Sequence, residues 1–147
     1  MLAANSDIAA GVKNSDVDFK NTFLTTYNIL NECDKFINKE TKILFASSSA
    51  IYGTVKNVIS ENTAPLKPES NYGSMKAACE SFISSYSNKN SLKSFIFRFP
   101  NVVGTNLTHG VIYDLSKKIL TNKKHLDVLG NGHQCKPYSD VSEIINC

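Results

Sequence analysis

Apolar residues recur along the chain at spacings that predict helices. Between residues 16 and 38 they fall at steps of three and four, which places them on one face of a helix about six turns long. The residues on this face are Phe19, Phe23, Tyr27, Leu30, Cys33 and Ile37. The same spacing returns over 72–86 and over 111–120. Three amphipathic helices are therefore expected.

Short apolar runs between these helices predict strands over 42–46, 94–99 and 126–130. Strand and helix then alternate, which is typical of a parallel sheet joined by crossover helices, so the expected class is α/β. A long connection over 47–71 is of the kind that carries function. The opening residues 1–4 look like the end of a buried strand, and we expect a chain that is cut at both ends.

Composition excludes several classes of protein. The chain has 147 residues, of which 41% are apolar, enough for a globular core. Its 16 basic and 13 acidic residues are scattered, so nucleic acid is not an expected partner. No apolar run is long enough for a membrane span, and the first residues do not form a signal peptide. The widely spaced cysteines Cys33, Cys79, Cys135 and Cys147 predict no metal site and a reducing, cytoplasmic location.

Candidate chemistry begins with the spacing Tyr-x-x-x-Lys, which puts both side chains on one face of a helix. A tyrosine has a pKa near ~10, and a neighbouring ammonium lowers it, so such a pair can act as an acid and base. The spacing occurs three times, at Tyr52–Lys56, Tyr72–Lys76 and Tyr113–Lys117. Spacing alone therefore does not identify a site.

Context favours Tyr72–Lys76. This pair begins a helix directly after the long connection, where the sites of open α/β sheets form. The strand over 42–46 leads into three serines, Ser47 to Ser49, at the carboxyl edge of the sheet. A serine hydroxyl there can hydrogen-bond a substrate alcohol that Tyr72 deprotonates. The alternative interpretation of the serines is an ordinary polar turn.

Further motifs surround this pair. Before and within the helix stand Phe45–Gly53 (FASSSAIYG), Glu61-Asn62, Pro65, Pro68 and Ser70–Lys76 (SNYGSMK) followed by Glu80. Elsewhere stand Leu2–Ala4, Asn21 with Thr25, Arg98–Gly104 (RFPNVVG), and Leu129–Gln134 (LGNGHQ) followed by Lys136 and Tyr138. Together they resemble the extended short-chain dehydrogenase/reductase family, in its NAD-dependent epimerase/dehydratase branch. The resemblance runs almost from end to end.

The resemblance implies roles for individual residues. The catalytic residues would be Ser48 as hydroxyl donor, with Ser49 as second choice, Tyr72 as acid and base, and Lys76 as its electrostatic partner. NAD would be bound by Ala3, Ala4, Asn21, Tyr72 and Lys76. The substrate would be bound by Ser48, Ser49, Asn101 and Lys136. At Lys136 the family usually has Arg, and Lys cannot form its two-pronged phosphate contact, so a weaker contact is expected.

The resemblance also implies an architecture. The expected fold is part of a Rossmann-like, doubly wound parallel sheet that lacks the glycine-rich first βαβ unit, followed by the start of a small substrate lobe. Residues 1–105 would belong to the dinucleotide-binding domain and 106–147 to the lobe. No GxGxxG or GxxGxxG occurs in the sequence. The helices over 16–38 and 72–89 resemble the pair that forms a homodimer contact in the family.

The implied activity is an NAD-dependent epimerase of the UDP-glucose 4-epimerase type, with hydride transfer at sugar C4 through a 4-keto intermediate. A dehydratase needs Asp-Glu after its Ser/Thr, and this chain has Ser49 and Ala50 there. Two alternatives stay open: a non-catalytic fragment of such an enzyme, and a nucleotide-sugar dehydratase or reductase of the same family. For the chain by itself, inactivity is the expectation. The sugar, and the choice between NAD and NADP, are left open.

Overall fold

The structure is a computed structural model that describes residues 1–121, 124–128 and 130–146. It divides into two compact units, Met1–Phe99 and Pro100–Cys147, and each is described here by itself. The assignment of residues 1–105 and 106–147 to a cofactor domain and a substrate lobe stays a prediction. Within the described residues, no helix combines the length and the hydropathy that a bilayer crossing requires.

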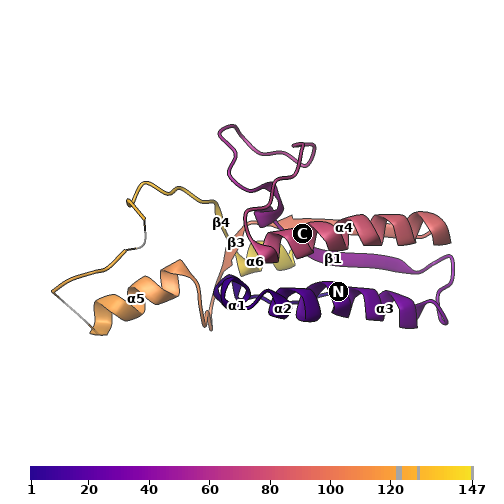
Figure 1. The fold of residues 1–147 in the computed structure, drawn as a ribbon, viewed down its shortest axis with the longest axis horizontal. Helices are drawn as coiled ribbons and strands as arrows, with labels where there is room; N and C mark the ends of the chain where they lie inside the picture. Colours follow the sequence, from indigo (N-terminus) through magenta and orange to yellow (C-terminus); the bar gives the residue numbers. More distant parts are fainter. Residues whose placement is uncertain (122–123, 129, 147) are drawn as a thin grey trace. The chain divides into compact units, whose positions relative to one another are not determined.

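The first unit is built on two parallel strands, β1 (Lys42–Ser48) and β2 (Lys93–Phe99), as predicted (Figure 1). Their register pairs Phe45 with Ile96 and Ser48 with Phe99, so both strands end at the same edge of the sheet. A short 3₁₀ helix, η2 (Ser49–Tyr52), follows β1 directly. The predicted long connection is thus shortened at its start, because β1 continues through Ser48 and η2 follows.

Helix α4 (Asn71–Asn90) confirms the helix expected to begin at residue 72. It begins where it does because the Ser70 side chain accepts a hydrogen bond from the Gly73 amide, at 3.0 Å. It ends at Ser91, which adopts a left-handed conformation with φ 54°. α4 packs on both strands and carries Tyr72 and Lys76 in its first two turns.

The single helix predicted over 16–38 is wrong in where it ends and in its regularity, because helical structure runs from Ser15 to Cys33 and includes a π-helical stretch. The chain forms α1 (Ile8–Lys13), α2 (Ser15–Asp18), the π-helix η1 (Phe19–Leu24) and α3 (Thr25–Cys33). Two caps that the apolar spacing does not reveal start the early turns: the side chains of Asp7 and Asn14 accept backbone N–H bonds. Past Cys33, Asn38 and Thr41 bond each other's backbone and side chains in a turn, which competes with continued helix.

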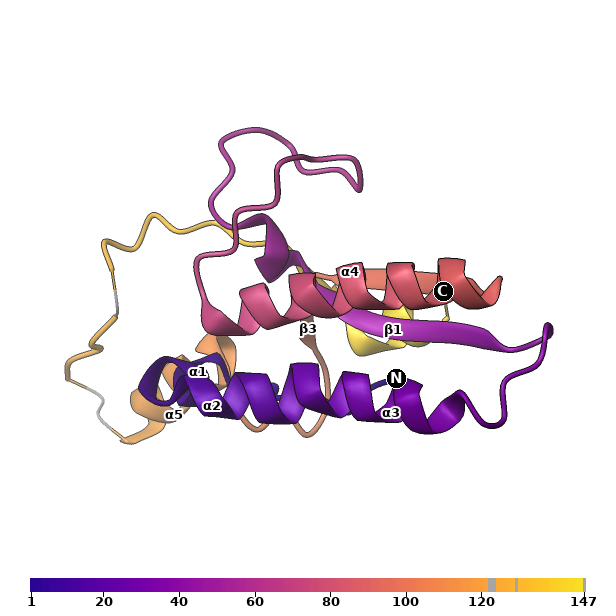
Figure 2. The same ribbon diagram turned by 45° about the vertical axis from the view of Figure 1, so that its right-hand side comes forward.

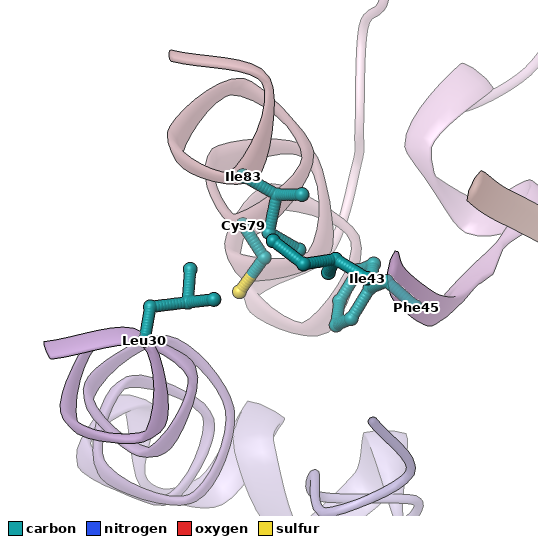
Figure 3. Packing of buried hydrophobic residues seen from close by; sticks show 5 residues of the cluster. All are labelled: Leu30, Ile43, Phe45, Cys79 and Ile83. Carbon is teal, nitrogen blue, oxygen red and sulfur yellow. The ribbon is translucent and has the colours of Figure 1, made fainter. Parts of the chain in front are cut away.

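The core lies between α3, α4 and β1. Figure 3 shows Leu30 of α3, Cys79 and Ile83 of α4, and Ile43 and Phe45 of β1 pointing toward one another, and all five are buried. The alternation along β1 explains this, because Ile43, Phe45 and Ser47 share one face of the strand. Figures 1 and 2 both show α3 and α4 running alongside β1.

The opposite face of the sheet is apolar and exposed. Leu44 lies opposite Phe95, and Ala46 lies opposite Phe97; Leu44, Phe95 and Phe97 are 49%, 46% and 37% exposed. The rings of Phe97 and Phe99 stack beside them, 5.9 Å between centroids. One face of the sheet is therefore covered by helices of this unit, and the other is not.

The free edge of β1 is occupied at one point by the first residue. The Met1 amino group donates to the Leu44 carbonyl, and the Ala46 amide donates to the Met1 carbonyl at 3.3 Å. This is the pattern of a parallel bridge between Met1 and Phe45.

In the second unit, β3 (Asn101–Val103) pairs in parallel with β4 (Tyr138–Asp140), and α6 (Val141–Ile145) packs on both. α5 (Val111–Thr121) confirms the helix predicted over 111–120. The strand predicted over 126–130 is wrong: residues 125–128 and 130 are irregular, and residue 129 lies outside the described residues. β4 pairs with β3 instead, and Gly130 and Gly132 have φ of 84° and 77°, which strands do not adopt.

Candidate active site

The site starts from the end of β1. Ser48 is extended, and its hydroxyl oxygen accepts a hydrogen bond from the Ala50 amide at 3.2 Å, which caps η2. Because that bond uses a lone pair of the oxygen, the hydroxyl proton stays available for donation. The start of η2 therefore orients the Ser48 side chain and leaves its hydroxyl free to donate.

A glycine brings α4 against this turn. A Cβ on Gly73 would lie 2.6 Å from the Ala50 carbonyl oxygen, so only glycine allows the backbones to approach this closely. The neighbouring residue is Tyr72, and the Ser48 hydroxyl lies close enough to lower the pKa of its phenol. The structure thus places Ser48 beside Tyr72, as the sequence predicted.

Tyr72 is half-buried, and burial raises the pKa of its phenol above the ordinary value. The hydrogen bond with Ser48 acts the other way, because a donated bond stabilises the phenolate, and the negative charge of Asp18 adds to the upward shift. A pKa lowered by Lys76 was expected from the sequence. In the chain by itself the pKa of Tyr72 is raised instead, because burial of the phenol is the largest cause.

Lys76 lies one helical turn further along α4 and is buried. Its Nζ donates to the Ala46 carbonyl at 2.7 Å and lies 5.8 Å from the centre of the Tyr72 ring. Burial lowers the pKa of this ammonium. An ammonium has three N–H donors, and this bond uses one. Lys76 can therefore hold hydroxyl oxygens of a bound molecule at the side of Tyr72.

A polar cluster supports the same elements from behind. The single N–H of Arg98 Nε is shared between both oxygens of the Glu80 carboxylate, at 3.2 Å to each. The carboxylate also accepts from Arg98 Nη2 at 2.8 Å and from the Ser47 hydroxyl. Arg98 Nη1 donates to the Tyr52 hydroxyl and to the Glu61 carbonyl, both at 2.8 Å. These bonds tie together the ends of β1 and β2, helix α4 and the connection after η2.

Sequence reasoning assigned no role to this cluster. Two signals could have found it. Arg98 is the one arginine in the chain, and Glu80 follows Lys76 at the helical spacing of four. The preference for Tyr72–Lys76 over Tyr52–Lys56 agrees with the structure, since the buried Tyr52 hydroxyl is bound to Arg98.

The remaining predicted residues are distributed over both units. Ser49 opens η2 and is half-buried, Ala3 is exposed, Ala4 is half-buried, and Asn21 is exposed on the π-helical turn η1. In the second unit, Asn101 Nδ2 donates to the Pro137 carbonyl at 3.2 Å, and Lys136 is exposed. Their contacts with cofactor and substrate stay predictions.

The Tyr-x-x-x-Lys spacing also gives a similar pair in α5, where no serine at the end of a strand accompanies it in the part of its unit that the structure describes. In α5, Lys117 Nζ lies 5.9 Å from the centre of the Tyr113 ring, close to the value for Lys76 and Tyr72. The hydroxyl donor at the end of a strand distinguishes the site at Tyr72. Among the described residues, no group of three His, Cys, Asp or Glu side chains could hold a metal ion.

Comparison with known proteins identifies the family to which the sequence of this chain belongs. The sequence model described as "NAD dependent epimerase/dehydratase family" matches residues 1–147. A D-erythronate dehydrogenase of Haemophilus influenzae is 38% identical over 88 residues, which cover 59% of this chain and 27% of that protein.

Two solved structures resemble the whole chain. A UDP-galactose 4-epimerase has a TM-score of 0.85 at 31% identity, over 98% of this chain and 46% of that one. A UDP-glucose 4-epimerase of Thermus thermophilus in complex with NAD has a TM-score of 0.82 at 29% identity, over 98% and 49%. The fold is therefore Rossmann-like, as predicted, with part of the parallel sheet present. The chain spans about half the length of these structures.

Proposed function

Because the chain belongs to the NAD dependent epimerase/dehydratase family, we propose that Tyr72, Ser48 and Lys76 carry out reversible oxidation of a nucleotide sugar. The observation that carries this proposal is that Tyr72 lies near both the Ser48 hydroxyl and the buried Lys76 ammonium. That arrangement gives one proton acceptor, one hydrogen-bond donor and one cation around a single turn of helix.

Each residue has a distinct task in the proposed reaction. Ser48 donates a hydrogen bond to the sugar 4-hydroxyl and holds it beside Tyr72. The Tyr72 phenolate takes the proton of this hydroxyl while hydride leaves C4. Lys76 stabilises the phenolate through its positive charge. Return of the proton from Tyr72 and of hydride to the other face of the 4-keto sugar gives the epimer.

The cofactor of this reaction is NAD, which supplies a hydride acceptor. The residues present fit its nicotinamide end: Lys76 has two further N–H donors for ribose hydroxyls, and its Nζ lies 5.8 Å from the centre of the Tyr72 ring. Ala3, Ala4 and Asn21 would hold the same end. The 147 residues contain no glycine-rich turn of the kind that binds the pyrophosphate.

Epimerisation suits this site better than dehydration. A dehydratase must protonate a departing hydroxyl and remove a ring proton, which takes further acids and bases. The positions after Ser48 that would hold them are Ser49 and Ala50. Reversible hydride transfer needs one acid and base, and Tyr72 supplies it. Asn101 and Lys136 would bind the nucleotide sugar, and the sugar would be a UDP-hexose.

A second candidate is the oxidation of a small hydroxy acid without epimerisation. The 38% identity to a D-erythronate dehydrogenase over 88 residues favours it. Both candidates use the same proton transfer at Tyr72 and differ in whether the ketone is reduced again. The third interpretation is a non-catalytic chain, because these 147 residues contain no glycine-rich turn for the pyrophosphate.

The test joins these 147 residues to the glycine-rich portion of the Thermus thermophilus epimerase. This chimera receives NAD with UDP-glucose, UDP-N-acetylglucosamine or D-erythronate. Appearance of the C4 epimer, followed by NMR, supports the proposal. NADH accumulation with D-erythronate alone supports the second candidate, and no turnover by a folded chimera contradicts both.

The chain by itself is expected to bind NAD at least about a hundredfold more weakly than the chimera, because several phosphate contacts of a dinucleotide site are worth a few kcal/mol. Calorimetric titration of both proteins measures the difference. Lys76→Met in the chimera should weaken its binding of NAD relative to the unchanged chimera. Lys117→Met is the matched control from α5 and should leave NAD binding unchanged. Micromolar binding by the chain itself would contradict this prediction.

We also propose that η1, α3 and α4 form a self-complementary contact with a second copy. Phe19 and Tyr27 are 45% and 43% exposed. Phe19 stacks on Phe23, and Phe23 and Tyr27 both contact the ring of Phe82, with centroids 6.0 and 5.5 Å apart. Exposed aromatic rings on adjacent helices are typical of a protein contact, and a twofold axis would repeat them in the partner.

Tyr27→Glu is expected to weaken this dimer by at least about tenfold, since it places a charge in the contact. Sedimentation equilibrium over a concentration series measures the effect. Val58→Glu is the control, because Val58 is 97% exposed in the connection before α4. A wild-type chain that stays monomeric at high concentration would contradict the proposed contact.

A further inference from the structure

The last residue of α2, Asp18, is a buried carboxylate with one oxygen unpartnered. Its side chain is 0% exposed. Oδ1 accepts a hydrogen bond from Asn5 Nδ2 at 2.7 Å, whereas Oδ2 has no hydrogen-bond partner. A buried carboxylate is costly when it is not neutralised, so its position calls for an explanation.

The surroundings hold this carboxylate in place. Asn5 is itself fixed, since its backbone amide donates to Thr22 Oγ1 at 3.0 Å and its Nδ2 also donates to the Asp7 carbonyl. On the other side, a Cβ on Gly11 would lie 1.8 Å from Asp18 Oδ2. Any residue other than glycine at position 11 would displace the carboxylate.

The same contacts lead to the site. The Gly11 carbonyl accepts a hydrogen bond from Asn71 Nδ2 at 3.2 Å, and Asn71 precedes Tyr72 in the first turn of α4. Both α1 and α2 pack against α4. Asp18 is thus held beside the turn of helix that carries the proposed acid and base.

The charged groups on the elements around Asp18 do not neutralise it in the part of the chain that the structure describes. Asp7 caps α1, Lys13 is exposed at its end, and Lys20 pairs with Asp16 at 2.9 Å. Lys76 donates to the Ala46 carbonyl. The ion pairs of Lys20, Lys35 and Arg98 join other side chains.

We propose that Asp18 is a positioning residue that acts through Tyr72: its fixed, buried charge opposes formation of the Tyr72 phenolate and keeps the side chain as a proton donor. The proposal rests on the role of Tyr72 given above. Like charges disfavour each other, so the phenolate forms less readily beside a carboxylate. The upward effect of Asp18 on the pKa of Tyr72 agrees with this geometry. The hydrogen bond of Ser48 acts in the opposite direction on the pKa of Tyr72.

The test measures Tyr72 directly in the 147-residue chain, without NAD or sugar. The tyrosines are labelled with ¹³C at Cζ, their resonances are followed by NMR against pH, and Tyr72→Phe assigns the signal. Asp18→Asn keeps an oxygen that can accept from Asn5 Nδ2 and removes the charge. It should lower the pH at which Tyr72 is half ionised. If that midpoint falls by about one pH unit, the ratio of phenolate to phenol at a given pH rises about tenfold.

Two controls separate this effect from others. Asp16→Asn removes the same charge two residues earlier, from a side chain that is 62% exposed, and should leave Tyr72 unchanged. The signal of Tyr113 serves as an internal control. If Asp18→Asn does not fold, Asp18→Ser removes the charge with a smaller side chain.

An unchanged Tyr72 midpoint in the folded Asp18 variant overturns the proposal, as does an equal change with Asp16→Asn. Because the titration needs no turnover, its result is independent of whether the chimera is active. If the chimera is active, Asp18→Asn should also move the basic midpoint of its rate profile to lower pH.

Discussion

Replacing Tyr72 by Phe in the active chimera is expected to lower turnover by about 10²–10⁴-fold, because the reaction then has no group to take the proton of the substrate hydroxyl. Ser48→Ala should also lower turnover, since it removes the donor that Tyr72 and the substrate share. Ser49→Ala should have little effect, because Ser48 and not Ser49 is the partner of Tyr72. Initial rates of epimer formation measure all three.

The control for this experiment lies in α5. Tyr113→Phe removes the same hydroxyl from a pair of nearly the same geometry, with Lys117 Nζ 5.9 Å from the ring centre. It should leave turnover unchanged. If Tyr72→Phe and Tyr113→Phe have equal rates, Tyr72 is not the acid and base. Circular dichroism of each variant establishes that the fold is retained.

The largest expected effect on stability is that of Glu80→Ala. The Glu80 and Arg98 side chains are 7% and 23% exposed, so the variant leaves a largely desolvated guanidinium without its partner. Breaking a buried pair in this way costs about 3–5 kcal/mol. The Ser47 hydroxyl loses its acceptor as well. Since small domains have about 5–15 kcal/mol of stability, this loss is a large fraction of the total, and the variant is expected to unfold at a clearly lower urea concentration.

Urea denaturation measures this change in the free energy of unfolding. Glu32→Ala is the matched control, because Glu32 and Lys35 form an ion pair at 2.8 Å whose side chains are 67% and 65% exposed. Solvent screens that pair, and its loss should change stability by no more than about 1 kcal/mol. Similar losses for the two variants would show that the Glu80 cluster does not hold the unit together.

Much of the first unit follows from local patterns. The apolar run of β1 and the periodicity of α4 predict both elements, because burial on one side decides where their apolar residues stand. The bounds of α4 come from Ser70 and Ser91, whose roles depend on a side-chain cap and a left-handed backbone. The position of Ser48 next to Tyr72 was predicted through motifs, and the structure adds the cause, the close approach of Gly73 to Ala50.

The failures have physical reasons as well. The helix predicted over 16–38 ends earlier, at Cys33, and is π-helical over Phe19–Leu24, and apolar spacing registers neither feature. The run at 126–130 has the composition of a strand, but a strand also needs a partner, and β4 pairs with β3. Asp18 was not predicted as part of the site, since its proximity to Tyr72 depends on how α1 and α2 pack against α4.

The bridge between Met1 and Phe45 has a practical consequence for anyone who expresses this chain. A residue added before Met1 would be directed along β1, next to the exposed backbone of its edge, rather than into solvent. The backbone of an amino-terminal affinity tag would therefore form hydrogen bonds with the free edge of β1. The tag would also lie near the exposed side chains of Leu44, Phe95 and Phe97 on one face of the sheet. Fusion at the carboxyl terminus leaves that edge as the structure shows it.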